Sequence, residues 1–373
     1  MKRFWILILV LFAASSPVHA AGFYQANQSA AAAGVANAFV ATANDASAIM
    51  YNPSGLAWQD GISIGAGVLL NYRNNSVKIP GGIAPNRSEE PTVGHLYMGW
   101  MPHDGRLGFG FGFAPLYQVN NTWGTPFGVS PSGTTKISVD HASFDSFYAV
   151  SSTLAIGVGA DWYLTRASLT QGAVTFKGKD YAGFGGHVSA LWKPAPAWSV
   201  GAMLRSGSRV SLSGNVNETL KIKLPDMLTL GVAHDFTDVW RLEGDVSWSR
   251  WSTLKDMNVV TTAGTVSQAN TLNLRDTLKA ALGLTWTWRE NTQFRFGYAY
   301  DQGANKSAGF NPVLSDQDGH QLSIGAGGAL SGMHVDLAYS YTFFANKTAT
   351  GAYAGTYRDR RQAIMLSVSN RLE

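Results

Sequence analysis

Apolar residues alternate with small or polar residues from Gly61 almost to the end of the chain. The run Gly61–Val68 is the first clear case, because every second residue in it is apolar. A period of two is typical of β-strands that have one apolar face and one polar face. About fourteen such segments follow one another, and uncertain boundaries allow two more or two fewer. The pattern predicts strands near 61–73, 92–102, 106–119, 135–150, 153–171, 179–193, 198–213, 220–234, 239–251, 274–288, 293–303, 319–330, 333–345 and 357–371.

The predicted strands and their connections favour a transmembrane β-barrel. Each strand is longer than the roughly 5–6 residues usual in soluble proteins and reaches the roughly 9–11 residues that cross a bilayer at a tilt. Every second connection is short, as at 103–105, 151–152 and 331–332, whereas those between are mostly long, as at 74–91 and 252–273. Outer-membrane barrels alternate short periplasmic turns with longer outer loops in this way. We therefore expect an even strand number and both chain ends on the periplasmic side.

The segment before the first strand differs in composition from the barrel. Residues 21–59 are rich in Ala, Asn and Ser, lack alternation, and contain stretches suited to short helical turns. A barrel of about fourteen strands is wider than its own side chains can fill. We therefore predict that residues 21–60 form an N-terminal hatch that plugs the barrel of residues 61–373.

The first twenty residues have the pattern of a secretory signal peptide. Lys2 and Arg3 precede an apolar run over 4–14, and Val18-His19-Ala20 fits the small-residue rule for cleavage after Ala20. The run is too short for a spanning helix, which needs about 20 apolar residues. The alternative is a buried N-terminal helix. Export and a barrel together predict the outer membrane of a Gram-negative cell.

Composition agrees with a membrane barrel more than with a soluble secreted β-protein. Charged residues make up only 14% of the chain, aromatic residues 12%, and the mean hydropathy is −0.03. Soluble domains carry roughly 25% charged residues, and barrels keep their apolar character hidden in alternation. Trp and Tyr recur near predicted strand ends, as in interfacial girdles. No block of like charges suggests nucleic acid binding, and the absence of cysteine excludes disulfides and thiolate chemistry.

Catalytic chemistry finds little support in the sequence. The histidines are scattered without metal-site spacing, and no Gly-x-Ser-x-Gly motif is present. Asp140, His141 and Ser143 lie close in sequence, but neighbouring residues on a strand point to opposite faces, so Asp140 and His141 cannot pair simply. We predict no catalytic residues, no metal and no cofactor.

Several motifs together resemble the long-chain fatty acid and aromatic hydrocarbon transporters of Gram-negative outer membranes. In the N-terminal segment these are Gly34–Ala38, the Asp45-Ala46 pair and Asn52-Pro53-Ser54-Gly55, where Ser54 replaces the usual Ala. Within the predicted barrel they are Leu224–Gly231, Gly244–Trp251 and Leu314–His320, the last with Ser and His in place of the family's Pro and Arg. The resemblance covers essentially the whole chain after residue 20.

The resemblance implies a fourteen-stranded barrel with a hatch, monomeric in outer-membrane lipid. It implies passive uptake of hydrophobic molecules, which leave sideways through a gap made by a kink in the third strand. That strand is 106–119 here, with Phe109, Phe111 and Phe113 on one face, followed by Ala114 and Pro115. Because proline lacks a ladder donor and is confined to edges, bulges or strand ends, Pro115 marks either the wall opening or a frayed strand end.

The identity of the cargo stays open between fatty acids and hydrocarbons. Trp123 and Phe127 follow the third strand and are predicted loop contacts for the ligand. A fatty-acid carboxylate needs a basic partner in the lumen, and Arg106 and Lys136 are predicted at the wrong depth. The alternative function is a general diffusion porin for small polar solutes, although porins lack an N-terminal plug.

Overall fold

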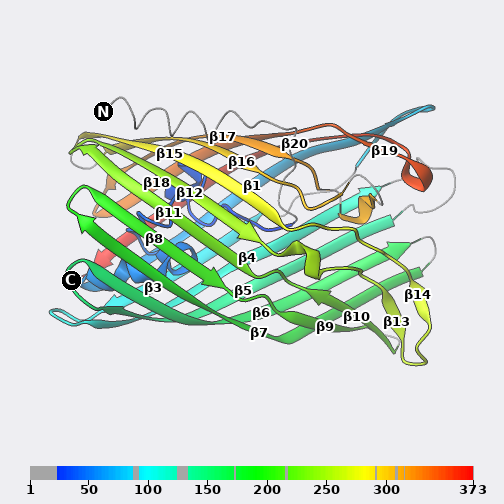
Figure 1. Ribbon diagram of the computed structural model, residues 1–373, viewed down its shortest axis with the longest axis horizontal. Coiled ribbons are helices and arrows are strands. Elements are labelled where there is room, and N and C mark those ends of the chain that lie inside the picture. Colours follow the sequence, from blue (N-terminus) through cyan, green and yellow to red (C-terminus); the bar gives the residue numbers. More distant parts are fainter. Residues whose placement is uncertain are drawn as a thin grey trace.

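A computed structural model describes residues 23–372, apart from 87–91, 124–132, 172–173, 215–216, 290–291, 307–309 and 315. The described part is a long barrel whose strands run obliquely along its axis (Figure 1). Its helical elements are α2 (Ala30–Gly34) and α3 (Ala48–Tyr51), with the 3-10 turns η1 (Pro53–Trp58), η2 (Trp251–Thr253), η3 (Pro312–Leu314) and η4 (Gly351–Tyr353).

None of the helices within the described ranges has the length and apolar character needed to cross a bilayer.

The strands follow the sequence prediction closely. They are β1 (Gly61–Ile79), β2 (Gly82–Pro85), β3 (Val93–Met101), β4 (Leu107–Trp123), β5 (Gly133–Ala149), β6 (Leu154–Gln171), β7 (Val174–Ala195), β8 (Trp198–Arg205), β9 (Arg209–Gly214), β10 (Glu218–Lys223), β11 (Met227–Thr237), β12 (Trp240–Ser249), β13 (Val259–Thr261), β14 (Val266–Gln268), β15 (Thr277–Arg289), β16 (Thr292–Asp301), β17 (Gly319–Leu330), β18 (Met333–Phe344), β19 (Lys347–Ala349) and β20 (Gly355–Leu372).

The barrel is antiparallel and closed. Sequential strands pair around the ring, and β1 pairs with β20 from Ile62↔Leu372 to Lys78↔Thr356. Over the described residues the ring has fourteen strands, with β8 and β9 forming the seventh and β10 and β11 the eighth. The predicted fold class is thereby confirmed. Closure leaves no sheet edge whose backbone groups would face hydrocarbon without a partner.

The seventh and eighth strands are interrupted at the same height. Pro225 has no amide hydrogen and cannot join a ladder, and the break is held by local hydrogen bonds instead. The Asp226 carboxylate accepts from the Gly207 amide at 2.7 Å, and the Leu224 amide donates to the Ser208 carbonyl at 2.8 Å. A Cβ on Gly207 would lie 2.2 Å from the Leu224 carbonyl oxygen, so only glycine allows the two interrupted strands to approach this closely.

The two faces of each strand differ as alternation predicts. On β6, Ile156 and Val158 lie on the outer surface with 47% and 57% of their area exposed, whereas Asp161 and Thr165 face the interior and are fully buried. Trp100 and Trp192 lie exposed near strand ends, as interfacial aromatics do. Tyr117 and Trp251 are different, because both are buried inside and packed against each other and Phe23.

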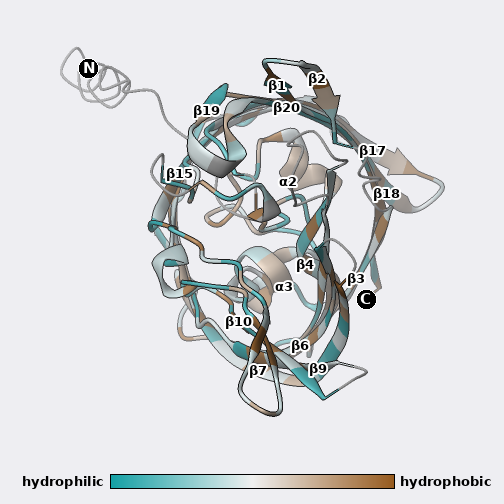
Figure 2. Cartoon of the chain, turned by 90° about the vertical axis from the view of Figure 1, so that its right-hand side faces the viewer, coloured by the Kyte–Doolittle hydropathy of each residue, from teal (hydrophilic) through white to brown (hydrophobic). Residues whose placement is uncertain are grey.

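The interior contains the segment that precedes β1, here called the hatch (residues 23–60). Viewed along the barrel axis, α2 and α3 lie within the ring of strands (Figure 2). Inward-facing glycines make room for it: a Cβ on Gly297 would lie 2.3 Å from the Ala36 amide, and one on Gly201 would lie 2.1 Å from the Val40 carbonyl oxygen. Glycines at these inward positions therefore allow the hatch to pack closely against the wall.

Candidate functional site

A gap in the wall opens between β3 and β4. Among the described residues, which exclude 87–91 just before β3, the two strands pair only from Leu96↔Phe113 to Trp100↔Phe109, although β4 continues to Trp123. Beyond Phe113 the free edge of β4 is covered by the start of the hatch. The Gln25 amide donates to the Leu116 carbonyl and the Gln118 amide to the Phe23 carbonyl, both at 2.9 Å. The chain's N-terminal segment therefore replaces a wall strand over this stretch.

Pro115 lies at the periplasmic end of the gap, two residues beyond the last position of β4 that pairs with β3. Opposite β5, β4 has a bulge between Pro115 and Tyr117, with Leu116 as the extra residue. The Pro115 carbonyl accepts a hydrogen bond from the Gln28 side chain at 2.9 Å. Pro115 thus lies in the middle of its strand, at a bulge, which excludes the frayed strand end as the explanation of its position.

The phenylalanines of β4 point away from the lumen. Phe109 and Phe113 are on the outer surface, with 48% and 37% of their area exposed, and Phe111 contacts Phe144 of the neighbouring strand there. Ala114 is fully buried. The inward positions are glycines, and Cβ atoms on Gly110 and Gly112 would meet Ile49 of α3 at 2.2 and 2.6 Å. The three phenylalanines therefore face lipid beside the gap, where any contact with cargo would occur outside the lumen.

The predicted hatch motif forms one compact turn. Asn52 is fully buried, and its side-chain amide donates to the Val40 carbonyl at 2.7 Å and to the Ala190 carbonyl of β7 at 3.0 Å. Its oxygen accepts from the Ser54 hydroxyl, and Pro53 begins η1. A Cβ on Gly55 would lie 2.0 Å from the Ala43 carbonyl oxygen. Asn52 thus joins two parts of the hatch to the wall.

Two acidic residues on β12 hold another part of the hatch. The Asp245 carboxylate accepts from the amides of Phe39 and Val40 at 2.8 and 3.0 Å. The Glu243 carboxylate accepts from the amides of Ala41 and Thr42 at 2.6 and 3.2 Å. Four successive hatch amides are therefore anchored by one strand of the wall.

Within the hatch itself there are two acidic residues, Asp45 inside the barrel and Asp60 exposed at its rim. The Asp45 carboxylate accepts from the amide of Ser47 at 2.8 Å and from the hydroxyl of the same residue at 2.5 Å. The barrel interior withdraws water from this carboxylate, and that burial raises the pKa of Asp45 above its ordinary value despite the bonds from Ser47.

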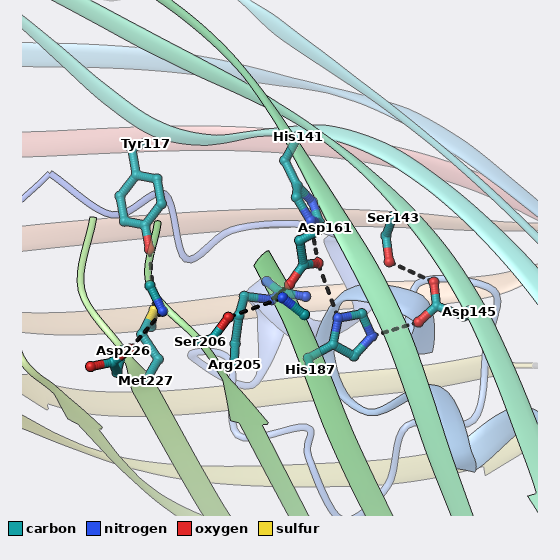
Figure 3. A network of polar contacts seen from close by, with 12 residues as sticks. Tyr117, His141, Ser143, Asp145, Asp161, His187, Arg205, Ser206, Asp226 and Met227 are labelled. Carbon is teal, nitrogen blue, oxygen red and sulfur yellow. Dashed lines mark hydrogen bonds and ion pairs between the residues drawn. The ribbon is translucent and has the colours of Figure 1, made fainter. Parts of the chain in front are cut away.

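A polar network lines the inner wall of β5–β8 (Figure 3). His187 contacts the Asp145 carboxylate at 2.6 Å and the Asp161 carboxylate at 3.0 Å. His141 contacts Asp161 at 2.6 Å, and the Arg205 guanidinium is 3.4 Å from the same carboxylate. The Ser143 hydroxyl donates to Asp145 at 2.5 Å and not to a histidine. The network therefore lacks the serine–histidine contact that activates a nucleophile, and it links four strands beside the hatch.

Two small lumen cavities share Tyr24 in their lining. One has a volume of about 80 Å³ and includes Phe23, Arg73 and Arg361, and the other has a volume of about 70 Å³ and includes Met50 and Met203. Tyr24, Ala26, Lys279 and Asp301 line both. Arg73 binds Asp359 through its guanidinium at 2.5–3.0 Å. Movement of the hatch segment that carries Tyr24 would enlarge both cavities.

The other predicted residues do not meet at one site. Trp123 donates to the Pro312 carbonyl at 3.2 Å and packs edge-on against Tyr357, within a cluster under the outer loops. Phe127 lies outside the described residues. Among described residues, one group has metal-binding geometry, made by the exposed side chains of Asp60, His103 and Asp104 at the periplasmic rim.

Sequence reasoning missed the two kinds of residue that hold the hatch in place. Glu243 and Asp245 stand on the inward face of β12, and two acidic residues two positions apart on one face of a strand were a usable signal. The pairing of Phe23–Gln25 with β4 had no comparable signal, because backbone hydrogen bonds depend little on the side chains involved.

Comparison with known protein families gives one match, to a model described as outer membrane protein transport protein (OMPP1/FadL/TodX), over residues 170–369. A long-chain fatty acid transport protein of Salmonella typhi is 22% identical in an alignment of 372 positions, gaps included. The alignment covers 81% of this chain and 82% of that protein.

Solved structures share the fold. A FadL homologue of Pseudomonas aeruginosa superposes with a TM-score of 0.83 at 18% identity, covering 94% of this chain and 100% of that chain. The toluene transporter TbuX of Ralstonia pickettii superposes with a TM-score of 0.73 at 16% identity, covering 92% of this chain and 98% of that chain. At these identities the comparison concerns the architecture alone.

Proposed function

Because this chain belongs to the outer membrane protein transport protein family (OMPP1/FadL/TodX), we propose that it carries amphipathic hydrophobic molecules, fatty acids foremost, across the outer membrane. The observation that carries the proposal is the N-terminal segment seated on the free edge of β4. Its departure would open the wall between β3 and β4 and enlarge both lumen cavities, because Tyr24 lines each of them. Cargo would then leave sideways into lipid, past Pro115 and the outward phenylalanines.

The lining of the cavities favours a cargo with a carboxylate. Lys279 lines both cavities, and Phe23, Tyr24 and three methionines supply apolar surface nearby. Methionine side chains adapt to irregular apolar ligands. A neutral hydrocarbon would make no polar contact with the half-buried Lys279, whereas a carboxylate would be a partner for its ammonium group, in competition with Asp301, which pairs with Lys279 across β15 and β16. Ligand pockets usually measure about 300–1,000 Å³, so cavities of about 80 and 70 Å³ must enlarge as cargo enters.

Transport in this proposal is passive. Burial of apolar surface, worth about 25 cal/mol per Å², draws cargo from the outer medium, and hatch movement releases it. A general diffusion porin is not favoured, because residues 23–60 occupy the lumen and bind strands on opposite sides of it. The motif Asn52-Pro53-Ser54-Gly55 and the β12 carboxylates would keep the rest of the hatch seated while the N-terminal segment moves.

A reversible cross-link tests the moving segment directly. Tyr24 and Tyr117 form an isolated antiparallel bridge, and the hydrogen bonds on either side make it a non-hydrogen-bonded pair, with Cα atoms about 4.5 Å apart. The double variant Tyr24→Cys/Tyr117→Cys suits a disulfide, and the chain has no other cysteine. In liposomes, oxidation should lower oleate uptake tenfold or more, and reduction should restore it.

The matched control links two strands at the closed seam. Tyr72→Cys/Gln362→Cys joins directly paired positions on β1 and β20, and oxidation there should leave oleate uptake unchanged. Equal oleate uptake by the oxidised and reduced Tyr24–Tyr117 variant would contradict the proposal, and sucrose entry through the intact protein would instead make it a porin. Lys279→Met should reduce uptake of oleate but not of toluene, and loss of both would contradict a carboxylate partner at Lys279.

A further inference from the structure

Four basic side chains gather on the outer surface of β5–β7, away from the lumen. In one row across the three strands, Ser168 of β6 lies between Lys136 of β5 and Lys177 of β7. In the next row towards the periplasm, Arg166 of β6 lies between Ser138 of β5 and Lys179 of β7. Neighbouring strands lie about 4.8 Å apart and residues about 3.3 Å apart along a strand, so the four positions fall within roughly 12 Å of one another. All four side chains are exposed. We call this group the outer cationic patch.

The patch lies at the depth of the outer headgroups. On the same face of β6, the outward positions from Leu154 to Leu164 are apolar, and Arg166 is the next outward residue. Ten residues extend about 33 Å along a strand, and a tilt of about 40° reduces this to roughly 25 Å, the height of the apolar band of a membrane barrel. Short turns mark the opposite, periplasmic end. The patch therefore faces the outer leaflet just above its hydrocarbon.

The arrangement is unfavourable for the isolated barrel. Like charges directly opposite each other in an antiparallel pair destabilise a sheet, and Arg166 and Lys179 form such a pair. Asp140 binds Arg166, and the Asp180 carboxylate already accepts from the amides of Ala182 and Ser211. Over the described ranges, Lys136, Lys177 and Lys179 have no carboxylate within ion-pair distance. The Lys179 ammonium lies over the Tyr181 ring, 5.5 Å from its centroid, but no described carboxylate neutralises the three lysines, so an anionic partner outside the chain can.

A groove gives the patch depth. It has a volume of about 650 Å³, and Lys136, Arg166, Lys177 and Lys179 line it together with serines of β5, β6 and β9. Below it on β6, Leu164 and Trp162 continue the apolar band, and Phe184 stacks on Trp162. A ligand seated here would meet cations and hydroxyls with its head and apolar side chains with its tail.

We propose that the outer cationic patch binds the phosphorylated headgroup of an outer-leaflet glycolipid of the lipid A type. The outer leaflet of a Gram-negative outer membrane presents such lipids, and their phosphates supply the negative charge that Lys136, Lys177 and Lys179 lack. A free phosphate ion would match the cations but would gain nothing from the apolar band beneath them. Gln118 and Asn120 of β4 line the same groove, so the bound lipid also contacts the outer half of the strand that borders the wall gap.

Lipid binding to the purified full-length barrel provides the test, measured by native mass spectrometry in detergent. The probes are bis-phosphorylated lipid A and the same lipid with both phosphates removed. Each basic residue near an anionic lipid surface contributes about 1 kcal/mol, so Lys177→Gln/Lys179→Gln should weaken binding of the phosphorylated lipid about thirtyfold. The control Arg106→Gln/Arg289→Gln removes two exposed charges at the periplasmic end and should leave binding unchanged.

Three outcomes would overturn the proposal. They are equal binding by wild type and the double-lysine variant, equal binding of the two lipids, and displacement of lipid A by excess inorganic phosphate, which would indicate a free-ion site. Heat-modifiable mobility on gels verifies that each variant is folded. Oleate uptake by the double-lysine variant should stay at the wild-type level, so this test and that of the proposed transport function fail independently.

Discussion

Asn52 shows how one side chain can hold a buried turn in place. Its amide group donates to Val40 and Ala190 and accepts from Ser54, so it satisfies backbone groups of both the hatch and the wall. The sequence identified the Asn52-Pro53 turn through the family resemblance and through the tendency of Asn-Pro to begin turns. The partners of Asn52 lie 12 and 138 residues away, and no local pattern indicates them.

Replacing Asn52 by alanine should loosen the hatch. Two buried carbonyl groups would lose their donors, and such losses cost about 2 kcal/mol together. The measurement is urea-induced unfolding of the refolded protein, followed by tryptophan fluorescence. Gln59→Ala serves as the control, because Gln59 donates one hydrogen bond to the Gly55 carbonyl at 3.0 Å from a partly exposed position. Equal destabilisation by the two variants would contradict a special role for Asn52.

Asp45 gives the hatch a pH dependence with a definite sign. Burial raises the folded-state pKa of Asp45 above the ordinary value of 3.8, so the unfolded chain gives up this proton first. Stability should therefore fall as pH rises from about 3.8 through the folded pKa, and stay lowered above it. Asp45→Asn keeps the acceptor for Ser47 but carries no charge.

We accordingly expect Asp45→Asn to have a higher melting temperature than wild type at pH 7, with the difference shrinking towards pH 4. Thermal melts at a series of pH values measure this. Asp60→Asn, at the exposed periplasmic rim, should follow the wild type throughout. If the melting temperatures of the wild type and Asp45→Asn differ by the same amount at every pH, Asp45 does not cause the pH dependence.

At the scale of elements, β4 shows what alternation can and cannot predict. The pattern correctly grouped Phe109, Phe111 and Phe113 on one face, but lipid and an apolar pocket select the same residue types, so the face itself was not determined. The intervening glycines were the better guide, because a wall strand needs small residues only where something packs closely against it. Gly110 and Gly112 meet Ile49 of α3. Strand boundaries were predictable because both faces obey one period over many residues.

Filling the glycine face of β4 should displace α3. A Cβ on Gly112 would come within 2.6 Å of Ile49, and overpacking of this kind costs about 1–3 kcal/mol. We expect Gly112→Val to speed hydrogen exchange of the amides of residues 48–51, read by mass spectrometry. Gly94→Val is the matched change, since the nearest atom to its Cβ is the Gly67 carbonyl oxygen at 3.8 Å. Unchanged exchange in the Gly112 variant would count against close packing of α3.

For the whole molecule, we expect the hatch to determine whether the barrel is a plugged or an open channel. It binds β20 through Ala30 and Ser367, β12 through Asp245 and β7 through Asn52. Loop lengths and composition predicted a wide closed barrel and a plug, since both are global quantities. The family resemblance predicted a wall gap at the third strand, but the cover over it by Phe23–Gln25 was not predictable, because a segment distant in sequence supplies the missing hydrogen bonds.

Removing residues 21–59 should convert the protein into an open pore. Liposomes that contain the shortened barrel should release sucrose, whereas those with the intact chain should retain it. Glu243→Ala/Asp245→Ala provides a second route that keeps the chain length, and it should give partial leakage because four hatch amides lose their acceptors. Sucrose retention by both variants would show that the hatch does not close the lumen.

The distance in sequence between the hatch and its partners has a consequence for how the protein is built. Ala30 donates to Ser367, 337 residues away, and Phe39 donates to Asp245, 206 residues away. Contacts of such separation form late, because the intervening chain must first be ordered. The hatch is synthesised before the strands that it contacts, and is thus among the last parts of the chain to reach its final position. On this order of events, each newly assembled molecule passes through a stage in which the barrel is closed but its lumen is not yet filled by the hatch, so the membrane is briefly permeable there.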